Sequence, residues 1–242
     1  IMIQTIPLLP GITLRCFPDS RFKQGTLSLQ IVRPMAESEN ALNALLPAVL
    51  LRGTAHHPDL RAITHRLDDL YGAAVGAVVR RVGDYQTTGL SCGFMEDRFA
   101  LEGDTVLAPM LEFLGQLLLE PALENGVFRA DYLESEKRNL ILSIEAQRND
   151  KRIYANARLN KLMCKADSFG IPRLGTVRQV EAITAETLYA HYRKILRESP
   201  MELFYIGSAD PQAVADLLRP ILSGFPRDPI TLPAQTPFRD GG

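Results

Sequence analysis

Apolar and polar residues alternate along residues 26–33, where leucine and isoleucine are separated by Ser28 and Gln30. This period of two predicts a strand with one buried face. Gly83-Asp84 lies between two further runs of this kind, and such a pair is typical of a hairpin turn. Strands are predicted at residues 13–17, 26–33, 75–82, 85–92 and 201–207, after a short extended entry between Pro7 and Pro10.

Apolar residues recur at helical spacing through most of the remaining chain, as in the stripe that runs from Leu60 to Leu70. Helices are predicted at residues 40–51, 58–70, 105–119, 127–159, 184–196 and 210–222, with the longest broken near Asn149-Asp150. The expected N-caps are Asn40, Thr184 and Asp210, since Asn, Thr and Asp side chains accept hydrogen bonds from free backbone N–H groups. Residues 168–182 have no clear period and are expected to be irregular.

The order of these elements bears on the fold class. The helices come in groups rather than between successive strands, so a doubly wound sheet is not expected. The order favours an α+β fold, in which helices pack on one face of a mostly antiparallel sheet. Residues 1–222 are expected to form a single domain. Four prolines follow Ser223, which predicts that residues 223–242 form a proline-rich linker or tail.

Composition indicates which kinds of partner and which cellular compartment are expected. Of 242 residues 46% are hydrophobic, enough for a sizeable core, and the net charge of −1 offers no general basic excess for nucleic acid. No apolar stretch is long enough to span a bilayer. The cysteines Cys16, Cys92 and Cys164 lie far apart, which favours buried thiols and a cytoplasmic, reducing location. No secretory signal is visible, but the chain starts at Ile1, so a processed start stays open.

The sequence contains no recognised catalytic motif. Phosphate loops, GxGxxG and the GxSxG elbow are all absent, and Ser208 is interpreted as a strand end. A zinc site on a helix needs two histidines four residues apart, and no pair among His56, His57, His65 and His191 has this spacing. All four histidines are therefore interpreted as surface residues. The acidic pairs Asp68-Asp69 and Glu134/Glu136 are interpreted as solvated helix faces.

Residues 137–165 are rich in positive charge. The cations are Lys137, Arg138, Arg148, Lys151, Arg152, Arg158, Lys161 and Lys165, against only Glu145 and Asp150. A solvated helix explains this composition. The alternative is a docking surface for an acidic partner, which would bind less tightly at high salt.

Several segments, taken in order, resemble the insulinase/pitrilysin family of zinc peptidases. They are the helix ALLPAVLLRGT at residues 44–54, the helix and glycine stop at 60–72, the hairpin at 75–92, the helix ESEKRNLILSI at 134–144, the loop and helix at 174–192, and Tyr205-Ile206-Gly207. The similarity spans roughly residues 10–222 and implies the fold of that family. It also implies that a second, similar domain lies beyond residues 223–242.

The resemblance also implies that the metal site is degenerate. Aligned on the Arg-Gly-Thr turn at residues 52–54, Ala44 and Ala48 stand where the family has the two histidines of its His-x-x-Glu-His motif. Pro47 stands where the family has its general-base glutamate, and Ser143 stands where the third ligand, a glutamate, is expected. Methyl groups and a proline ring do not bind zinc, so neither a metal nor any other cofactor is expected.

The function implied is that of a catalytically inactive domain, serving as the non-catalytic subunit or half of a peptidase or peptide-processing complex. Its partner would be a paralogue that carries the zinc motif, or its own second half. Active relatives bind peptide along an edge strand, and the matching positions here are Val75, Gly76, Ala77 and Val78. The alternative is that another element of the fold covers this strand. Two alternatives stay open: a purely structural scaffold subunit, and an active peptidase with an unrecognised site.

Overall fold

A six-stranded sheet forms the centre of the computed structural model, which describes residues 3–165 and 167–234. The strand order is β1 (Gln4–Leu9), β2 (Ile12–Pro18), β8 (Met201–Gly207), β3 (Gln24–Pro34), β5 (Tyr85–Met95) and β4 (Ala74–Val82). Only β2 and β8 run parallel to each other; the remaining ladders are antiparallel. A two-stranded hairpin, β6 (Leu123–Glu124) with β7 (Val127–Phe128), lies apart from this sheet.

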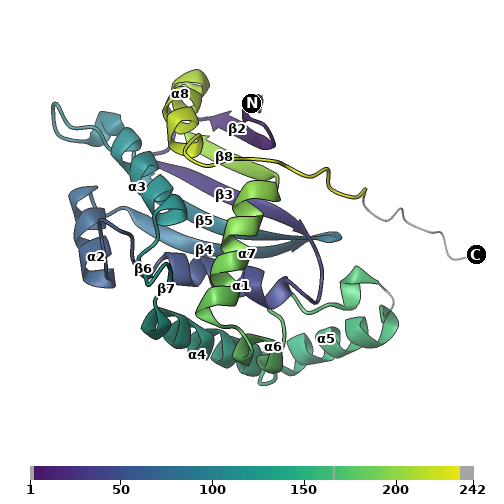
Figure 1. Ribbon diagram of the computed structural model, residues 1–242. Helices are drawn as coiled ribbons and strands as arrows, with labels where there is room; N and C mark the ends of the chain where they lie inside the picture. The colour runs from purple at the N-terminus through teal and green to yellow at the C-terminus, as the bar shows by residue number, and fades with distance from the viewer. Residues whose placement is uncertain (1–2, 166, 235–242) are drawn as a thin grey trace, which may run out of the picture.

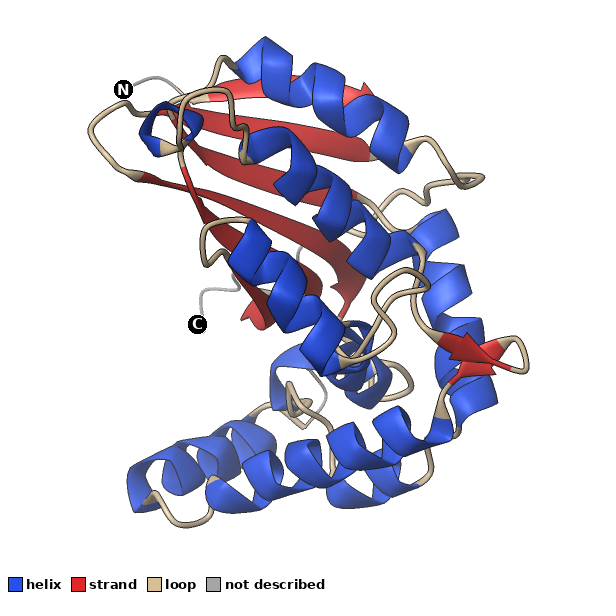
Figure 2. Ribbon diagram, turned by 90° about the vertical axis from the view of Figure 1, so that its left-hand side faces the viewer, coloured by secondary structure: helices blue, strands red, loops and turns tan. Residues whose placement is uncertain are grey.

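The helices gather on one face of the sheet, as Figures 1 and 2 show. They are α1 (Asn40–Leu50), α2 (Leu60–Asp69), α3 (Leu107–Leu119), α4 (Ala130–Ala146), α5 (Lys151–Met163), α6 (Val177–Glu181), α7 (Ala185–Glu198) and α8 (Pro211–Leu222), with short 3-10 turns η1 (Asp97–Phe99) and η2 (Ser168–Gly170). Leu27, Leu29 and Ile31 of β3 point into the core beneath these helices. The predicted α+β class is therefore confirmed.

Local chemistry explains most of the boundaries. Asp59, Asp150, Thr184 and Asp210 cap their helices through side-chain oxygens that accept backbone N–H groups. Asp150 thereby starts α5, which confirms the predicted break in the long helical stretch. Gly83, with φ of 58°, takes the left-handed conformation that the turn between β4 and β5 requires.

Three local predictions were wrong. Asn40 is not an N-cap but the first residue of α1, after Glu39 at the cap position. Val127 does not begin a helix: it belongs to β7, because the chain first turns back on itself through Asn125 and Gly126, both with positive φ. The stretch 168–182 is not wholly irregular, since a capping box between Thr176 and Gln179 starts the short helix α6.

The segment after α8 contains no helix or strand as far as residue 234. It nevertheless lies against the domain: Phe225 packs on the core, and the backbone N–H groups of Asp228 and Ile230 donate to the carbonyls of Arg197 and Glu198. Within the described residues, no helix is both long and apolar enough to cross a membrane.

Candidate functional site

The positions that correspond to a metal site lie on α1 and α4, which pack against each other. Ala44 is only 7% exposed, Pro47 is buried and Ala48 is half-buried on the same face of α1. Ser143 lies on α4, where it is exposed and its hydroxyl donates to the carbonyl of Asn139 in its own helix, at 2.9 Å. These groups do not fit zinc, because catalytic zinc takes three nitrogen, oxygen or sulfur ligands from the protein.

The other candidate ligands are dispersed. His56 is exposed and pairs with Glu120 at 2.9 Å, and His65 is also exposed. His57 is half-buried against the edge of the Phe113 ring. Across residues 3–165 and 167–234, no three His, Cys, Asp or Glu side chains come together in a way that could hold a metal ion.

The interpretation of His191 as a surface residue is wrong. It is 6% exposed, and its Nε2 lies 2.7 Å from Oδ1 of Asn43 on α1. The sequence did contain a signal of this burial: His191 lies three residues after Leu188 and four before Ile195, on the apolar stripe of α7.

The other acidic pairs and the basic stretch are placed as follows. Asp68 and Asp69 are exposed, as expected for a solvated helix face. Glu134 pairs with Lys137, whose ammonium also donates to the carbonyls of Glu181 and Ile183. Lys137 is buried, so it does not belong to a basic surface. Glu136 pairs with Arg52 at 3.3 Å and so joins α4 to the end of α1.

Ser208 follows β8 directly, and its hydroxyl and N–H both donate to Glu96.

Pro47 leaves one carbonyl of α1 without its normal helical partner. In an α-helix the N–H of residue 47 would donate to the carbonyl of Asn43, and proline has no N–H. The hydroxyl of Thr88 on β5 takes that place, donating to the Asn43 carbonyl at 2.6 Å. Both residues are buried, so a hydrogen bond from the sheet accommodates the proline.

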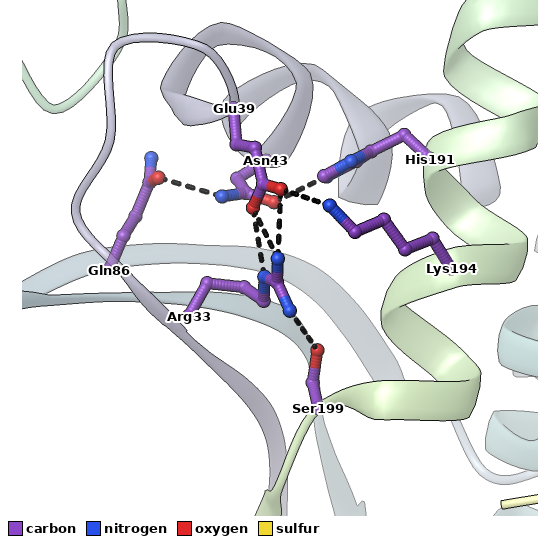
Figure 3. A network of polar contacts seen from close by, with 7 residues as sticks. All are labelled: Arg33, Glu39, Asn43, Gln86, His191, Lys194 and Ser199. Carbon is purple, nitrogen blue, oxygen red and sulfur yellow. Dashed lines mark hydrogen bonds and ion pairs between the residues drawn. The ribbon is translucent and has the colours of Figure 1, made fainter. Parts of the chain in front are cut away.

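A buried polar network continues from this point (Figure 3). The amide of Gln86 donates to the carbonyls of Asn40 and Arg173, which can only accept. Its oxygen therefore accepts from the Asn43 amide, at 2.9 Å. The oxygen of Asn43 must then accept from His191, so Nε2 of His191 carries a proton. Because burial lowers the pKa of His191 to about 4, the ring is neutral at pH 7.

A cluster of ion pairs lies beside this network (Figure 3). Arg33 of β3 makes a two-pronged contact with Glu39, with side-chain exposures of only 6% and 13%. Lys194 of α7 donates to the same carboxylate at 2.6 Å, and Arg33 also reaches the hydroxyl of Ser199 at 3.5 Å. Together these bonds lower the pKa of Glu39 despite its burial. The cluster fastens the start of α1 to the sheet and to α7.

Acid should weaken the fold through His191. Burial lowers the pKa of His191 to about 4, with Arg33 and Lys194 adding to the effect and Glu39 opposing it. A histidine of the unfolded chain has a pKa of about 6.5, so the unfolded state binds more protons between these values. The contribution of neutral His191 to the free energy of unfolding is therefore fully present above pH 6.5, and it is lost as the pH drops towards 4. Urea unfolding at pH 7, 6 and 5 measures this loss.

The control is a glutamine in place of His191, which can still donate to Asn43. His191→Gln should flatten the pH dependence in this window. His57, whose pKa is also lowered, chiefly by burial, should contribute less because more of it is in solvent. An unchanged slope in His191→Gln, with a flat profile in His57→Gln, would contradict the assignment.

β4 is the edge strand at which peptide binding was expected; among the described strands it pairs with β5 alone. Val82 and Tyr85 flank a two-residue turn and so form a hydrogen-bonded pair. Alternation along the regular ladder then turns the N–H and C=O groups of Val75, Ala77 and Val79 away from β5. Consistently, the Val79 carbonyl accepts from Nη1 of Arg173, at 2.6 Å.

The remaining positions of this edge differ in side chain and exposure. Gly76 is half-buried and has no side chain, Ala77 is exposed, and Val78 is buried on the other face of the sheet. Small side chains at the edge of a sheet favour the addition of a strand from another chain.

No family model matches the sequence. The probable inactive metalloprotease YmfF of Bacillus subtilis (strain 168) is 32% identical over 204 residues, which is 84% of this chain and 48% of that protein. Among solved structures, a conserved protein from Enterococcus faecalis V583 is 26% identical, with a TM-score of 0.87 over 93% of this chain and 53% of its own. A peptidase M16 inactive domain from Pseudomonas fluorescens has a TM-score of 0.76 at 17% identity, over 98% of this chain and 54% of its own. The chain thus spans about half the length of these relatives.

Proposed function

Because this chain is an insulinase/pitrilysin-like domain of the inactive kind, we propose that it is the non-catalytic part of a peptide-processing assembly. The observation that carries the proposal is the set of side chains on α1 and α4: Ala44, Pro47 and Ala48 offer no ligand, and the Ser143 hydroxyl is bonded within its own helix. The burial of Ala44 and Pro47 adds support, since substrate must reach a catalytic metal.

The catalytic zinc would then come from another polypeptide or another part of the same one. The relatives are about twice as long as this chain, which supports either its own second half or a zinc-motif-bearing paralogue as the partner. The contribution of this domain would be to bind peptide along β4 and present it to the partner. Main-chain hydrogen bonds to Val75 and Ala77 would provide affinity with little demand on peptide sequence.

Elemental analysis and a peptidase assay test the lack of catalysis. The purified chain should hold no stoichiometric zinc after dialysis against zinc-containing buffer, and should not cleave a mixture of fluorogenic peptides. Co-expression with a paralogue that carries His-x-x-Glu-His should yield a complex whose cleavage depends on the partner's motif. Chelator-sensitive cleavage by this chain alone, with one bound zinc, would refute the proposal.

A peptide titration followed by backbone NMR tests the binding role. Peptides of alternating apolar and polar residues should shift the amides of Val75 and Ala77 more than those of β1, the edge strand at the opposite side of the sheet. Shifts confined to other regions, or none at saturating peptide, would favour a purely structural scaffold subunit.

A further inference from the structure

A basic cavity of about 790 Å³ opens between α4, α5 and the segment that runs from η2 to α6. Its wall carries six cationic side chains: Arg81, Arg148, Arg158, Lys161, Arg173 and Arg178. No aspartate or glutamate of the described chain lines it. The excess of positive charge over residues 137–165 is therefore concentrated in part at one hollow, rather than spread evenly over a solvated helix.

These cations are not neutralised within the domain. None of the six forms an ion pair within 4 Å in the part of the chain that the structure describes. Arg81 and Arg173 donate to backbone carbonyls instead, and Nε of Arg81 is buried with no acceptor among the described residues. Burial lowers the pKa of both guanidinium groups, and Asp167, Asp84 and Cys164 oppose this effect for Arg81. An anionic ligand would compensate charges that the fold leaves partly desolvated.

The cavity is larger and more apolar than a site for a small anion needs to be. Ile153 and Tyr154 of α5 and Phe169 of η2 line it beside the cations, and all three are more than 40% exposed. A volume of this size accommodates several side chains. The combination of carboxylate-binding groups and apolar or aromatic surface is suited to a peptide that carries both acidic and apolar residues.

The cavity also lies at the end of the free edge of β4. Arg81 belongs to β4, and Arg173 occupies the outward carbonyl of Val79. A peptide paired with Val75 and Ala77 would therefore lose its next partner at Val79. That position is two residues, or about 7 Å, past Ala77. The peptide would leave the sheet at the mouth of the cavity.

We propose that this cavity binds the acidic side chains of a peptide whose neighbouring residues add to β4 as a strand. The proposal rests on the proposed function and names the class of peptide that this domain selects. Arg158 and Lys161 supply charge from α5 and Arg148 from the turn before it, while Arg81 and Arg173 join the cavity to the sheet edge.

Two fluorescent peptides test the proposal on the intact chain. Both contain the same six-residue alternating segment, flanked on each side by Glu-Asp-Glu in one and by Gln-Asn-Gln in the other. The acidic peptide should bind at least about tenfold tighter in fluorescence anisotropy, as two or more exposed ion pairs would give. The difference should shrink as salt is raised from roughly 50 to roughly 300 mM.

Matched double variants locate the effect. Arg158→Gln with Lys161→Gln should remove most of the preference for the acidic peptide and leave the neutral peptide unaffected. Lys151→Gln with Arg152→Gln removes the same two residue types from the same exposed helix, outside the cavity, and should change neither affinity. Because α5 has no buried residue, both variants should keep the stability of the parent chain.

The outcomes separate the two proposals. If both peptides bind alike and shift the amides of Val75 and Ala77, the cavity does not select acidic peptides although β4 binds peptide. If neither peptide binds, the cavity proposal and the peptide-binding role of β4 are both wrong, and the domain is a structural scaffold subunit. If a single-stranded oligonucleotide binds tighter than the acidic peptide and loses this affinity in the cavity variant, the site recognises nucleic acid and the peptide assignment is overturned.

Discussion

Glu39→Ala should lower the free energy of unfolding by about 3–5 kcal/mol, the range for removing one partner of a buried ion pair. The change leaves Arg33 charged at a position where 6% of its side chain is exposed, and it also removes the carboxylate that binds Lys194. Urea unfolding followed by circular dichroism measures the loss. The midpoint should fall without a change in the denaturant dependence, since the fold is retained.

The control is a more exposed ion pair on the sheet, joined by one hydrogen bond. Arg15 and Glu202 lie 2.8 Å apart, but their side chains are 40% and 30% exposed, so Glu202→Ala should cost no more than about 1 kcal/mol. A second variant that also replaces Arg33 by methionine should recover part of the stability lost in Glu39→Ala, because the stranded charge is gone. Equal losses for Glu39→Ala and Glu202→Ala would show that the cluster is not effectively buried.

Thr88→Val should cost about 1–3 kcal/mol, because it leaves the Asn43 carbonyl buried without a donor. The loss should depend on the proline. In a Pro47→Ala background the new N–H can donate to that carbonyl, so the same Thr88→Val change should cost less. A double-mutant cycle measured by urea unfolding should then give a coupling energy of at least about 1 kcal/mol.

The neighbouring threonine provides the matched control. Thr87 is also buried on β5, but its hydroxyl has no hydrogen-bond partner among the described residues. Thr87→Val should therefore leave stability unchanged or raise it slightly, since an unsatisfied hydroxyl is replaced by a methyl group. If Thr87→Val and Thr88→Val destabilise equally, β-strand packing and not the bond to Asn43 explains the effect.

These two predictions concern the same helix. In active relatives, as the resemblance implies, the helix equivalent to α1 holds the metal ligands. Here its start is fastened by Glu39 and Asn43, while the degenerate positions Ala44 and Pro47 are buried. The helix that would carry catalysis is thus integrated into the core. This is consistent with a role for the domain in shape and binding, with β4 and the basic cavity as its accessible features.

The sequence by itself determined the elements and the loss of the metal site. Strand alternation, the caps at Thr184 and Asp210 and the turn at Gly83-Asp84 act over a few residues, so they can be read directly. The replacement of metal ligands at Ala44 and Ala48 is likewise a matter of residue identity. Where local signals were misread, at Val127 and at the capping box of α6, they were short and adjacent to a longer helix.

Only the tertiary structure decided which polar groups meet. Pro47 shows from the sequence that one carbonyl of α1 lacks a donor, but not that Thr88 of β5, 45 residues after Asn43, supplies it. Similarly, the partner of His191 lies 148 residues away, and the cations of the basic cavity come from β4, the turn between α4 and α5, α5 itself, and the segment from η2 to α6. Helix and strand periods specify which face of an element is buried; they do not specify which distant face packs against it, because that depends on the packing of the whole core.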